Sequence, residues 1–193
     1  MMVHSKIFKL AFITVLFILF ACDQDLSVNP DESETTNVQV TILKLKPQNS
    51  LKKAYVAQKW IDSNGGYIIV GNESSGYSYL KFPEGALGTF SGVNNLSLSS
   101  ESVSGAYIQM SWESENLLQA DFFPEGLHFQ KPVYIRLSFK DADLTGINES
   151  DLAIYYFNPD TDGWELVSDF VNTEEDYVEG YINHFSRYAI GVE

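Results

Sequence analysis

The chain of 193 residues contains a single cysteine and few basic residues, and both shortages limit what it can be. With only Cys22, the protein cannot form an internal disulfide or a zinc site built from several thiolates. Twelve lysines and arginines against 26 acidic residues give a formal net charge of −14. This charge argues against nucleic acid or a bare anionic membrane as the partner, because both attract basic surfaces.

The sequence also lacks the motifs of common catalytic sites. It contains no glycine-rich phosphate loop, no nucleophile elbow and no cluster of metal ligands, so we expect neither a turnover enzyme nor a cofactor. His128 has no second nitrogen or thiolate near it in the sequence, and we interpret it as structural. Glu84 and Glu125 occupy the same place in two similar phrases, and we interpret them as turn residues rather than as an acid/base pair.

A short hydrophobic run lies near the N-terminus. Residues 10–21 are apolar except for Thr14, and they follow Lys6 and Lys9. The run is shorter than the roughly 20 residues that a helix needs to cross a bilayer. A basic start followed by such a run is the layout of a signal peptide.

The end of this run resembles the lipobox of bacterial lipoproteins, because it reads Leu19-Phe20-Ala21-Cys22. The resemblance implies loss of residues 1–21 and attachment of acyl chains such as palmitate to Cys22. Two or more acyl chains give lasting membrane attachment. We therefore expect an exported, membrane-anchored protein. Asp23 and Asp25 do not decide which membrane holds the protein. An acidic residue at this position retains some lipoproteins at the inner membrane, and in others it resembles a signal for the outer surface. We favour the outer membrane.

From residue 38 onward, short runs of aromatic and β-branched residues alternate with clusters of glycine, asparagine, aspartate and serine. Such runs are typical of strands, and such clusters are typical of turns. The predicted strands include 38–43, 67–70, 77–82, 96–98, 106–112, 133–139, 152–157 and 177–182. Residues 51–60 fit either a helix or a strand. Many short strands without helices between them predict an all-β, antiparallel β-sandwich.

Five phrases occur in one order along the chain: Gly65-Gly66-Tyr67, FPEGAL at 82–87, FPEGLHFQKPVYIRLSF at 123–139, LAIYYFNPDTDGWELV at 152–167 and VEGYINHFSRYAIG at 178–191. This order resembles the ZU-five domain of zonula occludens proteins, netrin receptors and ankyrins, which also occurs in bacterial surface lipoproteins. The resemblance implies a β-sandwich that serves in protein interactions and scaffolding. The predicted segments are a signal peptide at 1–21, a lipidated cysteine with a flexible acidic tether at 22–37, an N-terminal extension packing on the domain at 38–59, and a ZU-five-like domain at 60–193.

The resemblance also points to self-cleavage as an alternative function. Some ZU-five domains are cut between the phenylalanine and the serine of a triplet such as His184-Phe185-Ser186. Ser186 Oγ would attack the Phe185 carbonyl carbon to form an ester, with His184 as the general base, and water would then hydrolyse the ester. In the structural alternative, Phe185 packs in the core while His184 and Ser186 form hydrogen bonds where a strand begins.

A weak calcium candidate lies at Asn158, Asp160 and Asp162, whose spacing partly copies the alternate oxygen ligands of a calcium loop. Strand-like sequences flank these residues and a proline occupies the second position, so we predict a hairpin turn and no metal site.

Taken together, these observations predict a non-catalytic module that contacts another cell-envelope or extracellular protein. Glycan binding is a further alternative, which would require exposed tryptophans on one face of the sandwich. The chain has three: Trp60, Trp112 and Trp164.

Overall fold

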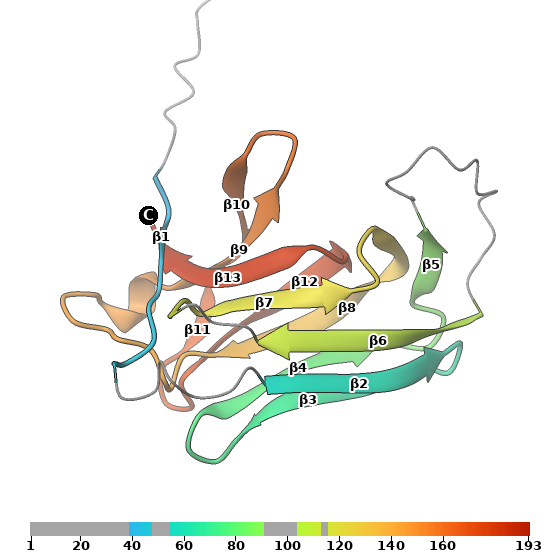
Figure 1. Ribbon diagram of the computed structural model, residues 1–193, viewed down its shortest axis with the longest axis horizontal. Coiled ribbons are helices and arrows are strands. Elements are labelled where there is room, and N and C mark those ends of the chain that lie inside the picture. The colour runs from blue at the N-terminus through green and yellow to red at the C-terminus, as the bar shows by residue number, and fades with distance from the viewer. Residues whose placement is uncertain (1–38, 48–54, 91–103, 113–115) are drawn as a thin grey trace, which may run out of the picture. The chain divides into compact units, whose positions relative to one another are not determined.

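The computed structural model describes residues 39–47, 55–90, 104–112 and 116–193 (Figure 1). These residues form two antiparallel β-sheets that pack against each other, which confirms the predicted all-β sandwich. The one helical element within these ranges is the short 3-10 turn η1 (Glu149–Asp151). Cys22, the predicted signal peptide and tether, and the predicted strand at 96–98 lie outside the described residues.

The first sheet has seven strands in the order β10-β9-β13-β7-β6-β2, with β1 paired to β13. Its strands are β1 (Thr41–Ile42), β2 (Tyr55–Asp62), β6 (Gly105–Trp112), β7 (Gln119–Phe123), β9 (Ala153–Asn158), β10 (Gly163–Ser168) and β13 (Arg187–Val192). In Figure 1, β6, β7 and β13 of this sheet form the layer nearer the viewer.

The second sheet has six strands in the order β11-β12-β8-β4-β3, with β5 paired to β8. Its strands are β3 (Gly66–Asn72), β4 (Gly76–Phe82), β5 (Leu87–Phe90), β8 (Leu127–Ser138), β11 (Phe170–Asn172) and β12 (Tyr177–His184). The twelve-residue strand β8 is the longest in this sheet, and β4 and β12 flank it.

Alternating side chains build the core between the sheets. On β8, Val133, Ile135 and Leu137 are fully buried, and on β6 the same holds for Ile108 and Met110. Because successive side chains on a strand point to opposite faces, the residues between these positions point away from the core. Complete burial of such a side chain contributes about 1.5–3 kcal/mol, so this alternation provides much of the folding energy.

An aromatic cluster fills one part of the core around Phe185, which is only 2% exposed. Its ring stacks on Phe122 at a centroid distance of 5.6 Å and meets Phe129 edge-on at 4.9 Å. Phe122 belongs to the first sheet and Phe129 to the second, so Phe185 joins the two sheets at the point where the chain passes from β12 to β13.

The two FPEG phrases turn the chain at the ends of β4 and β7. Gly85 and Gly126 adopt φ angles of 68° and 76°, a conformation in which glycine carries no steric penalty. The chain then continues into β5 and β8, which pair with each other. The repeated phrases therefore mark corners of the fold, as predicted.

The helical alternative for residues 51–60 is wrong over its described part, because residues 55–60 belong to β2. All eight residues of β2 pair with β6, and this ladder outweighs the local preference of alanine, glutamine and lysine for helix. β2 also runs through the predicted boundary between residues 59 and 60, so that both sides of this boundary belong to one strand.

Gly76 and Gly146 form a matched pair for testing the packing beside β8. Their φ angles are 75° and 77°, but a Cβ atom on Gly76 would lie 1.9 Å from Ser138 Oγ, whereas one on Gly146 would meet nothing within 4 Å. Replacement by alanine strains both backbones equally, and only Gly76→Ala adds a clash. We predict that urea denaturation shows a further loss of about 1–3 kcal/mol for Gly76→Ala relative to Gly146→Ala. Equal losses would contradict the packing of Ser138 against Gly76.

Candidate functional site

The outer face of the second sheet is rich in tyrosine. The core residues of β3, β4, β8 and β12 alternate with outward-facing side chains, which the register places side by side across the sheet. We call this surface the tyrosine face and define it by Tyr67, Ile69, Tyr77, Tyr79, Lys81, Tyr134, Arg136, Glu179 and Tyr181.

Large side chains on this face are open to solvent. Tyr181 is 64% exposed, Tyr67 57%, Tyr77 50% and Ile69 45%. A depression of about 360 Å³ lies beside Tyr181 and is lined by Tyr79, Lys81, Pro83, Pro132, Tyr134 and Tyr181. Apolar side chains gathered on one open surface are a mark of binding sites.

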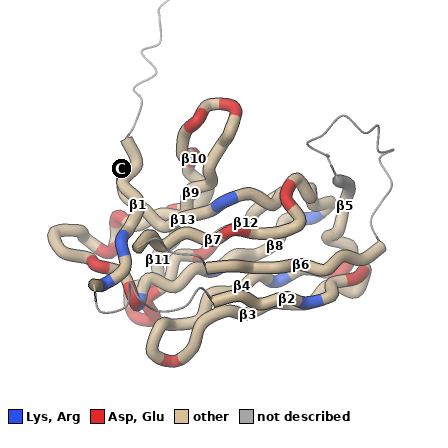
Figure 2. Tube along the Cα trace, viewed as in Figure 1, with Lys and Arg blue, Asp and Glu red and all other residues tan. Residues whose placement is uncertain are grey.

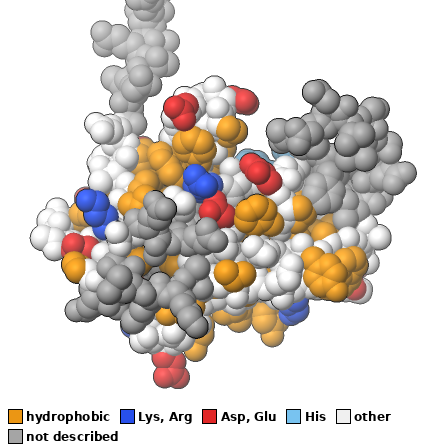
Figure 3. Space-filling model, in the orientation of Figure 1, with side chains coloured by type: hydrophobic (Ala, Val, Ile, Leu, Met, Phe, Trp, Pro, Cys, Tyr) orange, Lys and Arg blue, Asp and Glu red, His pale blue; other side chains and the backbone are white. Residues whose placement is uncertain are grey.

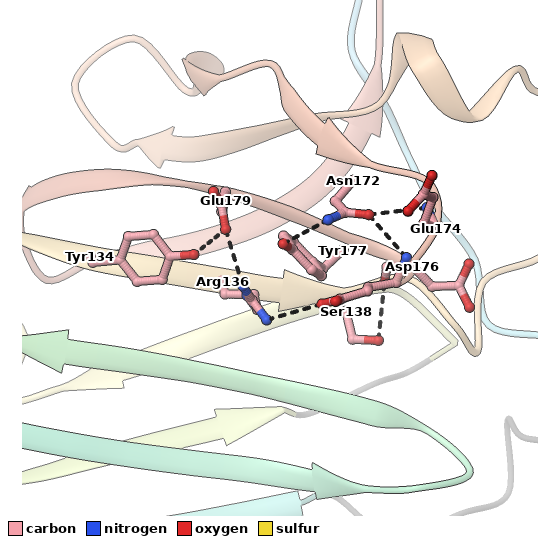
Figure 4. Close-up of polar contacts among 9 residues, drawn as sticks. Tyr134, Arg136, Ser138, Asn172, Glu174, Asp176, Tyr177 and Glu179 are labelled. Atoms are coloured by element: carbon pink, nitrogen blue, oxygen red, sulfur yellow. Dashed lines mark hydrogen bonds and ion pairs between the residues drawn. The ribbon is translucent and has the colours of Figure 1, made fainter.

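Arg136 lies at the centre of the tyrosine face, between the rings of Tyr177 and Tyr79. Figure 4 shows it beside Tyr177 and Glu179. Its guanidinium carbon is 3.6 Å from the ring centroid of Tyr177 and 4.9 Å from that of Tyr79. Arg136 Nη2 lies 3.3 Å from Glu179 Oε2, which also accepts a hydrogen bond from the Tyr134 hydroxyl. Because guanidinium stacking and ion pairing act together, this cluster fixes the rings around it.

The cluster also determines the protonation of Tyr134. Burial raises the pKa of the Tyr134 hydroxyl well above its usual range, and the hydrogen bond to Glu179 raises it further. Tyr134 therefore remains a neutral donor to the Glu179 carboxylate. Arg136 forms two ion pairs at the centre of this face: its Nη2 lies 3.3 Å from Glu179 Oε2, and its Nη1 lies 3.7 Å from Oε2 of the exposed Glu175. Besides this cluster, the face offers a bound molecule rings, hydroxyl groups and the ammonium groups of Lys81 and of Lys59, which lies over the Tyr67 ring.

The structure places the predicted triplet at the turn between β12 and β13. Ser186 Oγ donates a hydrogen bond to the Phe157 carbonyl at 3.1 Å, whereas His184 Nδ1 lies 3.4 Å from the Phe185 carbonyl oxygen. The hydroxyl and the imidazole thus contact different carbonyl groups. Phe185 itself is buried in the aromatic cluster.

This arrangement predicts that the chain stays intact at Phe185. For cleavage, the Ser186 hydroxyl would have to leave Phe157 and approach the Phe185 carbonyl carbon with a base beside it. Intact-mass measurement under denaturing conditions should show no species lacking residues 186–193, and Ser186→Ala should leave the pattern unchanged. Release of that segment in the unmodified chain, but not in Ser186→Ala, would establish self-cleavage instead.

The predicted calcium candidate and the three tryptophans do not belong to the tyrosine face. Asn158 ends β9 and Asp160 and Asp162 follow it in the β9–β10 hairpin, where Asn158 Oδ1 accepts a hydrogen bond from the Asp160 backbone N–H at 2.9 Å. Trp60 is 51% exposed on β2, whereas Trp112 packs against the core and the Trp164 ring packs on Phe157. The tryptophans therefore do not form one exposed group.

His128 lies beside a second histidine, a neighbour that its sequence context does not indicate. His184 lies directly opposite it across the β8–β12 pair, and the two ring centroids are 5.6 Å apart. No local sequence signal could reveal this neighbour, because only the strand register brings the two residues together. The sequence likewise gave no signal for Arg136 between its tyrosines.

No family model matches the chain. The chain is similar to a protein of Evansella cellulosilytica that is provisionally named a membrane protein, with 38% identity over 56 residues. The aligned segment is 29% of this chain and 8% of that relative. Among the described residues, no helix has both the length and the apolar character needed to cross a membrane. The ZU-five assignment stays a prediction.

Arg136 and Arg187 provide a matched test of the cluster. Arg136 and Glu179 side chains are each 22% exposed, whereas Arg187, which pairs with Asp121 at 2.8 Å, is 48% exposed. We predict that Arg136→Ala lowers the free energy of unfolding by about 2–3 kcal/mol, because it leaves the Glu179 carboxylate without its cation and removes packing from Tyr177. Arg187→Ala should cost at most about 1 kcal/mol. Chemical denaturation measures both, and equal costs would contradict a structural role for the central pair.

Proposed function

We propose that this protein is a membrane-anchored lipoprotein that binds a basic protein partner through its tyrosine face, without catalysing a reaction. The observation that carries the proposal is the grouping of exposed tyrosines around the paired Arg136–Glu179 centre on one open sheet. This reading agrees with the interaction and scaffold role that the ZU-five resemblance implies.

The composition of the face favours a protein as the bound partner. Tyrosine and arginine are enriched in protein interfaces, and a tyrosine ring has few torsions to immobilise on binding. Arg136 already pairs with Glu179 and Glu175, so a partner that covers it would not leave its charge unpaired. The shallow depression between Tyr79 and Tyr181 suits a projecting side chain of the partner.

The net charge of the whole chain favours a partner that presents lysine or arginine to the turns around the tyrosine face, where Glu73, Glu174 and Glu175 lie. The whole chain has a net charge of −14, and loss of Lys6 and Lys9 with the signal peptide changes the balance to 10 basic against 26 acidic residues, or −16. Figure 2 shows acidic residues in many of the turns that border the strands. The tyrosine rings also accept cations within the molecule, since Lys59 Nζ lies 4.3 Å from the centroid of Tyr67.

The opposite side of the sandwich is a weaker candidate. Trp60 and Tyr107 meet there at a ring distance of 5.0 Å and are both exposed, which is the pair that a glycan would use. Figure 3, which views the side of β6 and β7, shows hydrophobic side chains in separate patches divided by polar and charged atoms. One exposed tryptophan with one tyrosine is a small platform, so we rank glycan binding below protein binding.

The lipobox at Cys22 supports membrane attachment, and the name of the Evansella relative is compatible with it. Residues 22–37 would then act as the tether that lets the domain reach its partner. Asp23 and Asp25 fit either membrane, but the aromatic, β-rich domain and its ZU-five phrases favour placement at the outer membrane, where the partner would be another envelope or extracellular protein.

Site-specific photo-cross-linking in cells that make the protein tests this proposal. A benzoylphenylalanine side chain at position 67 or 181 should link to the same protein, and one at position 107 should not. Tyr107 is a matched control because it is equally exposed, at 65%, on the other sheet.

The linked protein is then purified and its affinity measured. Tyr181→Ala and Tyr67→Ala should each weaken binding at least tenfold, Tyr107→Ala should have little effect, and added salt should slow association. Binding that depends on Tyr107 rather than on Tyr181 would refute the tyrosine face. Glycan binding that is lost in Trp60→Ala, without any protein partner, would support the alternative.

A further inference from the structure

Two histidines from different strands meet in the second sheet, at a distance from the centre of the tyrosine face. His128 lies next to the start of β8, and His184 is the last residue of β12. The register pairs them directly, with ring centroids 5.6 Å apart and ring planes inclined by 46°. His128 is exposed and His184 is partly exposed. Figure 3 shows histidine atoms at the molecular surface, so solvent and ions reach them.

The spacing fits two imidazoles on one tetrahedral metal ion. A zinc–nitrogen bond of about 2.0–2.1 Å places each ring centroid roughly 3.2 Å from the metal, so two rings at the tetrahedral angle have centroids roughly 5.2 Å apart. The observed 5.6 Å exceeds this value by about 0.4 Å, which small side-chain rotations remove. A square-planar ion would require a separation of roughly 4.5 Å, which fits less well.

The orientation of His184 leaves one nitrogen available for a metal. Its Nδ1 lies 3.4 Å from the Phe185 carbonyl oxygen. Because a carbonyl can only accept a hydrogen bond, this contact places the proton on Nδ1 and the lone pair on Nε2. Metal-bound histidines commonly donate their second nitrogen to a backbone carbonyl in this way. The Tyr156 ring meets the imidazole edge-on at 5.2 Å and holds its plane.

We propose that His128 and His184 bind a divalent metal ion of the zinc class. Within the described ranges, no group of three or more His, Cys, Asp or Glu side chains is placed to hold a metal, so the remaining positions are taken by water or by a donor from a bound molecule. The metal would join β8 to β12 beside the core phenylalanine Phe185. This inference does not depend on the proposed role of the tyrosine face.

Zn(II) titration of the protein purified in detergent, followed by calorimetry, tests the site. The third histidine, His4, belongs to the predicted signal peptide, so His128 and His184 are the histidines of the processed protein. We expect one Zn(II) per chain in the unmodified protein and in the control variant Tyr107→Ala, whose exposed ring lies on the other sheet. His128→Ala and His184→Ala should each weaken binding at least tenfold. His128 is exposed, so its replacement leaves the fold intact even if His184→Ala disturbs it.

A second measurement identifies the ligands directly. The X-ray absorption spectrum of the Zn(II) complex should show two imidazoles at about 2.0 Å, and that of His128→Ala should show no more than one. Zn(II) should also raise the melting temperature of the unmodified chain and leave that of His128→Ala unchanged, because the ion binds only the folded pair. No saturable Zn(II) binding, or binding that survives His128→Ala at full strength, would overturn the proposal.

Discussion

Strand β8 is hydrogen-bonded on both sides, and the alternation of its side chains determines what each face of its sheet contains. Val133, Ile135 and Leu137 are buried completely between the sheets. A shift of one residue in its register would turn these three side chains to solvent and bury Tyr134 and Arg136 instead. The hydrophobic core therefore fixes the register, and the register in turn places the residues of the tyrosine face.

The tyrosine face follows from this constraint. Arg136 stands opposite Glu179 on β12 and Tyr79 on β4, so the ion pair and the ring stacking arise from the same alignment. Because Arg136 is paired with Glu179 and stacked on Tyr79 and Tyr177, it holds these tyrosine side chains in place. The pairing of β8 with β12 shifts its register between Ile182 and His184, and beyond this shift His128 lies opposite His184. One pair of strands thus carries both a face suited to a protein and a pair of nitrogens suited to a metal.

Local patterns predicted the corners and six strands, since alternation and FPEG turns act over a few residues; the six are β3, β4, β6, β8, β9 and β12. Of the predicted strand at 38–43, only Thr41–Ile42 is a strand in the described part. Local patterns did not distinguish helix from strand at residues 55–60, where helix-forming residues are held in β2 by pairing with β6. The partners of Arg136 and of His128 come from β12, and no local pattern contains the register that joins them. The lipidation of Cys22 is inferred from the lipobox sequence alone and stays a prediction.

Hydroxyl-radical footprinting tests the central claim, that the tyrosine face is the surface covered in the cell. The oxidation rate of each tyrosine would be compared, by mass spectrometry, between the protein in its native membrane and the same protein purified in detergent. The account predicts that Tyr67, Tyr77 and Tyr181 react more slowly in the membrane, whereas Tyr107 reacts equally in both. Protection of Tyr107 with unchanged reactivity of Tyr181 would contradict it.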